Sequence, residues 1–377
     1  MIRLILLILC FLLSLLCVLP APQFDIWYIS IMASEFSWLF LIITSILLLL
    51  GFRMRKYGVA GTVIGLFAIV LFFIPLITAY GKGNTLAADM DSAFATPASA
   101  VTGNIFSISN CFTTDEKVPH STMTYANGSE GPITLDLYSA KKNGMRPCVI
   151  VIHGGSWSAG DSRQLPELNS RLAVAGYHVA SINYRLAPAH ISPAPVEDVQ
   201  AALTYLRAHA GELFIDTTNF VLLGRSAGGQ IALTAAYSLH DSGVKGVVNF
   251  YGPTDMPWGY THPANPLVLN TCKVMEDYLG GPLETATANY NAASAVITAT
   301  ASSVPTLTIH GKNDPLVHYE HAVHLEDKLT TLGVKHYTLS LPWATHGCDY
   351  SLHSPSGQLS TYAVLRFLDI VTAGAAK

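Results

Sequence analysis

The stretch that decides the fold is Phe220-Val221-Leu222-Leu223-Gly224-Arg225-Ser226-Ala227-Gly228-Gly229. Its four leading apolar residues predict a buried strand, and the chain from Ala227 onward has the composition of a helix. The Gly-x-Ser-x-Gly pattern at the junction, Gly224 to Gly228, is typical of a sharp turn that raises a serine hydroxyl above a sheet. The helix N-terminus beside Ser226 would supply backbone N–H groups for an anion. A glycine-rich turn with an incidental serine is the alternative interpretation.

A second glycine pair follows another apolar run. His153-Gly154-Gly155-Ser156-Trp157 comes directly after Cys148–Ile152. Adjacent glycines after a strand let backbone N–H groups point into a site, and we expect Gly154 and Gly155 to do so. Together with the N–H of Ala227 they would bind the oxyanion of a tetrahedral intermediate. A tight turn without a function is the alternative.

A nucleophilic serine of this kind needs an acid and a histidine downstream in the order Ser, Asp, His. Asp314 and His346 each follow a strand-like run and come in that order after Ser226. His346 would take the proton from Ser226 and return it to the leaving group, and Asp314 would fix the imidazole tautomer. Asp255 also follows an apolar run and is a second candidate for the acid. A helix cap or a turn is the alternative role for either aspartate.

Apolar runs and helical stretches alternate through the last two-thirds of the chain. The runs have the continuous hydrophobicity of strands buried on both faces, and they cover 148–152, 179–182, 220–223, 246–250 and 306–309. Helical stretches at 165–175, 196–209, 227–239 and 319–331 separate them. Two half-buried strands around the turn signal Asn127-Gly128 come first. This alternation predicts an α/β fold with a mostly parallel, doubly wound sheet, whose functional residues follow strand ends.

The motifs together resemble the α/β-hydrolase superfamily, in particular hormone-sensitive-lipase-like and feruloyl-esterase-like carboxylesterases. The resemblance rests on 153–157, on Tyr184-Arg185-Leu186-Ala187-Pro188, on 193–199 and on 224–229, and it covers about 121–377. It implies the α/β-hydrolase fold, esterase or lipase activity on a small-molecule or lipid-like ester, and no cofactor. The chain departs from the family pattern at Ser156, where a third glycine is common, and at Arg225, where an acidic residue is common. Both departures leave the substrate preference open.

The composition excludes several classes of protein. Of the 377 residues, 50% are hydrophobic and only 12% are charged, with a net charge of −4. A soluble domain averages about a quarter charged residues, so this is neither a disordered chain nor a basic nucleic-acid-binding protein. The charge is uneven, because residues 1–80 hold four basic residues and two acids, which leaves −6 for the rest. The apolar excess therefore lies at the front of the chain.

Three charge-free stretches at the front predict three transmembrane helices within residues 1–81: Leu4–Phe24, Phe36–Phe52 and Tyr57–Gly81. The basic cluster Arg53, Arg55 and Lys56 lies between the second and the third. The positive-inside rule then places this cluster and the N-terminus in the cytoplasm and the catalytic domain outside it. A cleaved signal peptide is the alternative for the first stretch, although Pro20-Ala21-Pro22 is a poor cleavage site.

The remaining segments follow from this division. Residues 82–120 are expected to be a linker and 121–377 the catalytic domain, in which 251–300 would form a lid or pocket wall. His318, His321 and His324 recur every three residues, and we expect an exposed histidine face there rather than a metal site. A disulfide among Cys111, Cys272 and Cys348 is allowed outside the cytoplasm, but the sequence does not pair them.

The expected activity is hydrolysis of carboxylic esters through an acyl-enzyme on Ser226. The same machinery also serves amidases, peptidases and transacylases. A non-catalytic receptor on this fold would normally lack a member of the triad, whereas all three are present. A channel or transporter would be expected to carry acidic or basic residues inside its spans, and the three stretches have none. The sequence leaves the oligomeric state open.

Overall fold

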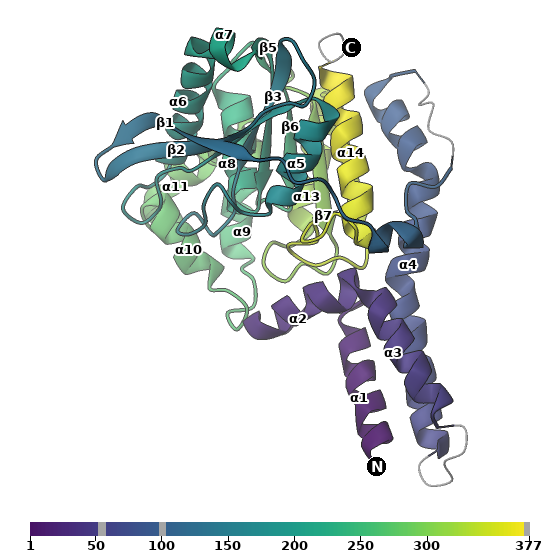
Figure 1. The fold of residues 1–377 in the computed structure, drawn as a ribbon. Helices are drawn as coiled ribbons and strands as arrows, with labels where there is room; N and C mark the ends of the chain where they lie inside the picture. The colour runs from purple at the N-terminus through teal and green to yellow at the C-terminus, as the bar shows by residue number, and fades with distance from the viewer. Residues whose placement is uncertain (52–57, 98–102, 373–377) are drawn as a thin grey trace.

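A slender bundle of helices at the N-terminal end supports a larger body built round a sheet (Figure 1). The computed structural model describes residues 1–51, 58–97 and 103–372. The basic cluster Arg53, Arg55 and Lys56, on which the expected sidedness depends, lies outside the described residues.

The body contains one eight-stranded sheet with the order β1-β2-β4-β3-β5-β6-β7-β8. β1 pairs antiparallel with β2 and β2 antiparallel with β4, while every later pair is parallel. The predicted α/β fold with a mostly parallel sheet is therefore confirmed. The strands are β1 (His120–Gly128), β2 (Gly131–Tyr138), β3 (Arg146–Ile152), β4 (His178–Ile182), β5 (Ile215–Arg225), β6 (Val244–Phe250), β7 (Thr306–Gly311) and β8 (His336–Leu341).

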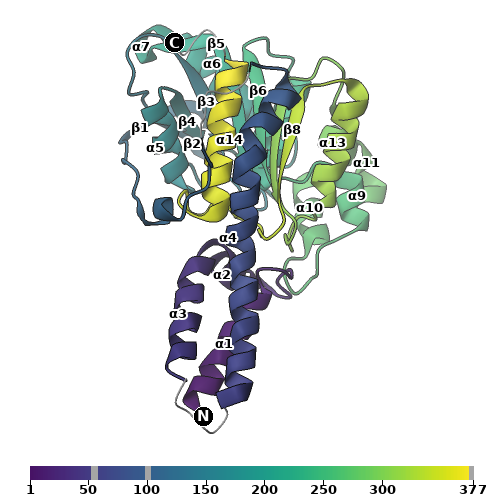
Figure 2. The ribbon, with the colours of Figure 1, turned by 90° about the vertical axis from the view of Figure 1, so that its right-hand side faces the viewer.

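Helices cover both faces of this sheet, which is why its central strands are continuously apolar. Within β3, Ile150 belongs to one apolar cluster and its neighbours Val149 and Val151 to the other. The first cluster is covered by α6 (Ala194–Ala208), α8 (Ala227–Ser238) and α13 (Glu320–Leu332). The second is covered by α5 (Pro166–Ala175), α14 (Pro355–Val371) and, unexpectedly, part of the N-terminal helix α4 (Gly58–Phe94). α4 and α14 run side by side in Figure 2.

Residues 251–300, which the sequence suggests as a lid or pocket wall, are mostly helical. Four short helices occupy most of this segment: α9 (Met256–Thr261), α10 (Thr271–Leu279), α11 (Leu283–Ala292) and α12 (Ala295–Thr298). Two further short elements are the 3₁₀ helix η1 (Ile108–Phe112) and α7 (Ala210–Leu213). Side-chain caps from Asp255 on α9 and from Asn270 on α10 begin two of these helices.

The N-terminal bundle differs from three simple spans. α1 (Ile2–Leu15) stops well before Phe24, and Pro20 and Pro22 follow, which cannot continue a helix because they lack an N–H. The expected loop before the second span is instead a helix, α2 (Phe24–Glu35), bent by 80° from α3 (Ser37–Leu49). At 14 and 13 residues, α1 and α3 measure only about 21 and 20 Å, against a hydrocarbon core of about 30 Å.

α4 has the length that α1 and α3 lack. It runs unbroken for 37 residues, and its apolar part is long enough to cross a membrane. Among the described residues it alone passes that test as a single helix, while α2 and α3 pass only as a bent pair. The structure thus provides one strong candidate span and does not by itself establish three.

The expected linker at 82–120 is wrong over its first part, because α4 continues to Phe94. Leu86, Met90 and Phe94 recur every four residues and are all buried against the body. The Phe94 ring lies 5.4 Å from that of Phe367 on α14, and Arg366 Nε donates to Asp91 Oδ1 at 2.9 Å. The sequence shows no strong period here, because only three large apolar residues recur among Ala, Ser and Thr after the composition changes at Gly81.

Candidate active site

Ser226 stands at the turn between β5 and α8 in a strained backbone conformation, with φ of 53° and ψ of −120°. Two glycines make the turn possible because the chain crosses itself closely there. A Cβ at Gly224 would lie 1.9 Å from the Gly228 carbonyl oxygen, and a Cβ at Gly228 would lie 2.2 Å from that of Ile152. The backbone N–H of Ser226 donates to Phe250 O at 2.9 Å, which fixes the turn to β6.

The three residues chosen from the sequence form one hydrogen-bonded chain. His346 Nε2 lies 2.9 Å from Ser226 Oγ, and His346 Nδ1 lies 2.7 Å from Asp314 Oδ2. His346 is on the loop after β8 and Asp314 on the loop after β7, so all three follow the carboxyl ends of parallel strands. Both side chains are buried. The arrangement has the geometry of a nucleophile, a base and an orienting acid.

Asp314 is held as an ionised acceptor. Its Oδ1 accepts the backbone N–H groups of Leu316 and Val317, each at 2.9 Å, and His310 Nε2 lies 3.3 Å from Oδ2. Burial alone would raise the pKa of Asp314. His346 and His310 outweigh that effect, so the pKa lies well below its usual range. The second candidate acid, Asp255, instead caps α9 and pairs with His324, so the structure does not bring it to His346.

The expected oxyanion donors are not equivalent. The Gly154 N–H already donates to the side-chain Oε1 of Gln164 at 2.7 Å. Within the described part of the chain, the N–H groups of Gly155 and Ala227 are paired with no acceptor. Gly155 has φ of +122°, and a Cβ there would lie 2.0 Å from Ala159 O, so only glycine fits this turn. Gly155 and Ala227 are therefore the free pair, and Gln164 is a partner that the sequence did not suggest.

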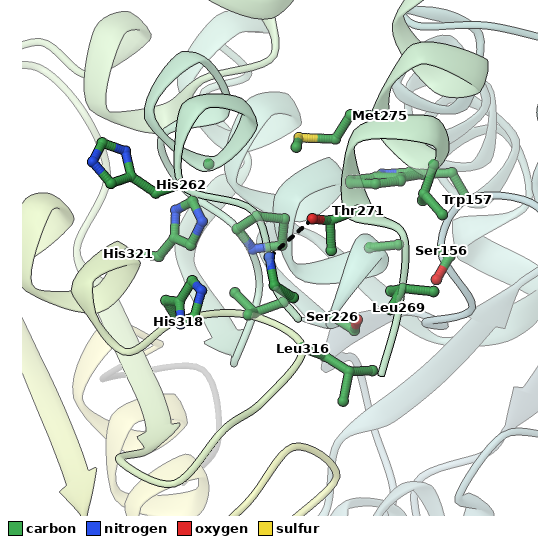
Figure 3. Close-up of a pocket in the computed structure, with 16 residues that line it drawn as sticks. Ser156, Trp157, Ser226, His262, Leu269, Thr271, Met275, Leu316, His318 and His321 are labelled. Atoms are coloured by element: carbon green, nitrogen blue, oxygen red, sulfur yellow. Dashed lines mark hydrogen bonds between the residues drawn. The ribbon is translucent and has the colours of Figure 1, made fainter. Parts of the chain in front are cut away.

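A mostly apolar pocket opens beside Ser226 (Figure 3). One wall is Trp157, whose ring stacks on Tyr278 at 4.4 Å and whose Nε1 donates to Gln230 at 2.9 Å. Half of the lining comes from the segment 251–300. The lining residues are Ser156, Trp157, Ser226, Ala227, Pro253, Gly259, His262, Ala264, Leu269, Thr271, Val274, Met275, Leu316, Val317, His318 and His321.

Arg225 does not reach this pocket, although it precedes Ser226. Its side chain is buried, with Nε 2.5 Å from Asp349 Oδ2 and the guanidinium 5.6 Å from the centre of the Phe250 ring. The Tyr251 hydroxyl donates to the other oxygen of Asp349, and the Tyr251 ring lies 4.5 Å from that of His346. The ion pair thus joins the residue before the serine to a residue three positions after the histidine. Sequence reasoning missed Asp349 because an aspartate in a loop carries no signature of its partner.

Trp27 is a second residue that the sequence did not single out for the site. It lies on α2, and its Nε1 donates to the backbone carbonyl of His346 at 2.9 Å. Nearby, Asn313 Nδ2 donates to Cys17 O at 3.3 Å, so both loops that carry the histidine and the acid contact the N-terminal segment. Because 319 positions separate Trp27 from His346, no local pattern could have shown this contact.

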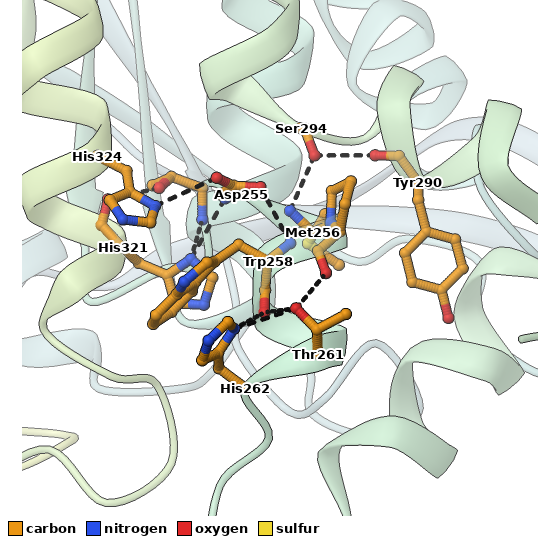
Figure 4. A network of polar contacts seen from close by, with 11 residues as sticks. Asp255, Met256, Trp258, Thr261, His262, Tyr290, Ser294, His321 and His324 are labelled. Atoms are coloured by element: carbon orange, nitrogen blue, oxygen red, sulfur yellow. Dashed lines mark hydrogen bonds and ion pairs between the residues drawn. The ribbon is translucent and has the colours of Figure 1, made fainter. Parts of the chain in front are cut away.

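The three spaced histidines differ in their surroundings, and Figure 4 shows two of them, His321 and His324. His321 is buried, and its Nδ1 accepts the backbone N–H groups of Thr254 and Asp255, each at 3.2 Å. His324 pairs with Asp255, and His318 lines the pocket. The expected exposed face is thus wrong for His321. No group of three metal-binding side chains occurs in the described ranges.

The cysteines form no disulfide in this structure. All six fall in the described ranges, and each is a free thiol. Cys348, two residues after His346, is buried, and burial raises the pKa of its thiol well above the usual value. A raised pKa disfavours the thiolate, so Cys348 is a packing residue rather than a second nucleophile.

The family comparison covers half of the chain. The BD-FAE family profile matches residues 135–329. Among curated relatives from Mycobacterium tuberculosis, the probable carboxylic ester hydrolase LipM is 30% identical over 61% of this chain and 56% of its own length. Esterase LipC from the same organism is 27% identical over 65% of this chain and 64% of its own length. The chain thus spans less than two-thirds of either relative.

Solved structures with lower sequence identity establish the fold. A hyperthermophilic esterase from Pyrobaculum calidifontis superimposes with a TM-score of 0.58 at 21% identity, over 80% of this chain and 98% of its own. A bacterial heroin esterase gives a TM-score of 0.60 at 20% identity, over 78% and 93%. The sheet and its helices therefore form the α/β-hydrolase fold.

We expect Asp349→Asn to destabilise the protein by about 3–5 kcal/mol, because it leaves the buried charge of Arg225 without its counterion. Urea unfolding of the full-length protein in detergent, followed by tryptophan fluorescence, measures the loss. Asp277→Asn is the matched control, since its pair with Lys273 is exposed, and it should leave the midpoint unchanged. Equal midpoints for Asp349→Asn and the wild type would contradict the structural role of the ion pair.

We expect His321 to make the fold acid-sensitive. Burial, followed by the charges of His310, His324 and His318, lowers the pKa of His321 to about 3. The pKa of a histidine in the unfolded chain is near 6.5. The contribution of neutral His321 to the unfolding free energy is therefore fully present above that pH and is lost as the pH falls toward 3.

Between pH 7.5 and pH 5 the unfolding free energy of the wild type should fall by about 2 kcal/mol more than that of His321→Asn. The asparagine side chain does not titrate, but its oxygen can still accept the N–H groups of Thr254 and Asp255. Urea titrations at the two pH values measure this difference, and His240→Asn, at an exposed position after α8, is the control. Parallel losses in the wild type and His321→Asn would show that His321 does not titrate in this way.

Proposed function

The chain belongs to the BD-FAE family, and on that premise we propose that it is a serine hydrolase that cleaves carboxylic esters. The observation that carries the proposal is the continuous hydrogen-bonded chain from Ser226 through His346 to Asp314 beside an apolar pocket. Curated ester hydrolases among the relatives support the ester bond as the target. Amide hydrolysis and acyl transfer use the same three groups, but the named relatives favour esters.

The reaction follows from the positions of these groups. Ser226 Oγ attacks the ester carbonyl while His346 Nε2 takes its proton, and the imidazolium then returns that proton to the departing alcohol. Water attacks the resulting acyl-enzyme, His346 again accepts a proton, and the carboxylic acid leaves as Ser226 is restored. Asp314 holds the tautomer with a proton on Nδ1, because its Oδ2 is the acceptor at 2.7 Å.

Stabilisation of the oxyanion falls to backbone donors. Gly155 and Ala227 supply two N–H groups, and Gly154 contributes a third only if Gln164 releases it. A donor of this kind is worth about 10²–10³ in rate where one has been removed. The pocket walls at Leu269, Met275 and Leu316 suit the apolar part of an acyl group.

We also propose that the protein is anchored in a membrane by its N-terminal helices, with the catalytic domain outside the cytoplasm. Support for anchoring comes from α4 and from the many exposed apolar side chains of α1 and α3. The alternative that α1 is a cleaved signal peptide is disfavoured because Arg3 Nε donates to Leu47 O at 2.7 Å, which joins α1 to α3 inside the bundle. Support for the sidedness comes from the basic residues at 53–56 in the sequence.

Ser226→Ala should lower kcat/KM for p-nitrophenyl acetate by at least about 10³-fold, because no other group in the chain described here replaces the nucleophile. A fluorophosphonate probe should label the wild type once and leave this variant unlabelled. Ser242→Ala, at an exposed loop, is the control and should behave as the wild type. Substantial turnover by folded Ser226→Ala, or an unlabelled wild type, would refute the assignment.

The sidedness is tested by reporters fused to the C-terminus of the full chain. An alkaline phosphatase fusion, which folds only after export, should be active, whereas a green fluorescent protein fusion exported in unfolded form should be dark. The reverse pattern would place the catalytic domain in the cytoplasm.

A further inference from the structure

We propose that the substrate is an ester that resides in a lipid bilayer, and that α2 lies in the bilayer surface directly below the active site. The inference rests on the proposed esterase activity and adds a substrate class to it. Its basis is the position of α2, which contacts the catalytic loop with one face and exposes apolar side chains on the other.

α2 is apolar over most of its length and exposes several apolar side chains on its outer side. Phe24, Tyr28, Ile29 and Met32 recur at intervals that place them on one side, and their exposed fractions are 40, 54, 44 and 43%. The opposite side is buried against the rest of the protein through Ser30, Ile31 and Ser34. Asp25 is exposed on this same side, in the first turn, where a carboxylate is favourable to the helix dipole and can reach the headgroup region. α2 has no basic residue, so its outer face would bind lipid through apolar contact rather than through anionic headgroups.

This outer face continues an apolar surface on the neighbouring helices. Large apolar side chains are exposed along α1 from Ile2 to Leu12, along α3 from Leu39 to Leu49, and along α4. On α4 the surface extends from Val59 to Tyr80, about 33 Å along the helix, which matches a hydrocarbon core of about 30 Å.

The depth of α2 follows from the same lengths. α1 and α3 rise from the end of the bundle where α4 begins, and α2 crosses their other ends (Figure 1). α1 and α3 are about 21 and 20 Å long. If the hydrocarbon core of about 30 Å begins where α4 begins, α2 lies no more than about 10 Å inside its opposite surface. This places α2 near the boundary between the hydrocarbon core and the headgroups.

The inner face of α2 contacts the active-site loop. Trp27 Nε1 donates to His346 O at 2.9 Å, and a Cβ at Gly347 would lie 3.3 Å from Ile31 Cδ1. A helix with its side chains is about 10–12 Å thick. The loop that carries His346 therefore stands only about one helix thickness above the lipid-facing surface of α2.

The pocket wall reaches the same surface. Residues 264–271 line the pocket at Ala264, Leu269 and Thr271, and the tip of this loop meets the start of α2. Phe24 N donates to Leu267 O at 3.0 Å, and Asn265 Nδ2 donates to Pro22 O at 3.0 Å. The Leu267 side chain is 72% exposed beside α2. An ester at headgroup level would thus meet the pocket wall without crossing bulk water.

The experiment uses the full-length protein in phosphatidylcholine vesicles and two substrates. 4-Methylumbelliferyl palmitate resides in the bilayer, and p-nitrophenyl acetate is dissolved in water. Ile29→Lys places a charge on the lipid-facing side of α2 while the other helices keep the protein in the vesicle. We expect this variant to lower kcat/KM for the palmitate ester about tenfold and to leave the acetate rate within about twofold.

The matched control is Phe214→Lys, a substitution of an exposed aromatic residue after α7, at the end of the body farthest from the bundle (Figure 1). It should change neither rate. Met32→Lys, on the same side of α2, should reproduce the effect of Ile29→Lys and guards against misfolding of a single variant.

Equal changes of the two rates, or no change of either, would overturn the proposal. A shift in oligomeric state caused by Ile29→Lys with an unaltered palmitate rate would also overturn it, because a second copy rather than lipid would then cover α2. A wild type inactive on both substrates would instead refute the proposed esterase function.

Discussion

The close crossing of the backbone at the turn after β5 is the constraint on which the rest of the structure depends. The chain can reverse there only if the residues at 224 and 228 have no Cβ, since one would collide with a carbonyl oxygen at 1.9 or 2.2 Å. The reversal forces Ser226 to a φ of 53° and turns its hydroxyl out of the sheet. The parallel strands β7 and β8 then end at the same edge, so the loops that follow them bring Asp314 and His346 within reach.

Much of this could be predicted from the sequence because the relevant signals are local. The apolar runs of β3, β5 and β7 and the Gly-x-Ser-x-Gly turn each lie within a few residues, and strand order then brings their ends together. Asp314 was preferable to Asp255 because only one helix and one strand separate it from His346, and the structure brings Asp314 to His346 while Asp255 caps a helix. Pattern and topology were enough to find these residues without any knowledge of packing.

What the sequence did not reveal is long-range. Arg225 stood out as an unusual residue beside the nucleophile, but only packing shows that its charge is directed to Asp349 and away from the pocket. The contact between Trp27 and His346 joins opposite ends of the chain. The end of α4 was missed for a different reason, since a change from membrane-like to soluble composition at Gly81 was taken for the end of a helix that in fact continues through it.

α4 has a mechanical consequence. A helix that leaves the bundle and continues along α14 restricts the rotation of the body above its anchor, and Pro75, which removes one hydrogen bond from α4, is the point at which the helix bends most easily. With the anchoring proposed here, the enzyme would lose its tumbling motion and one direction of translation, and would search a plane instead of a volume. Its rate of encounter with substrate would then depend on the number of ester molecules per unit area of membrane, and dilution of the surrounding solution would not change it.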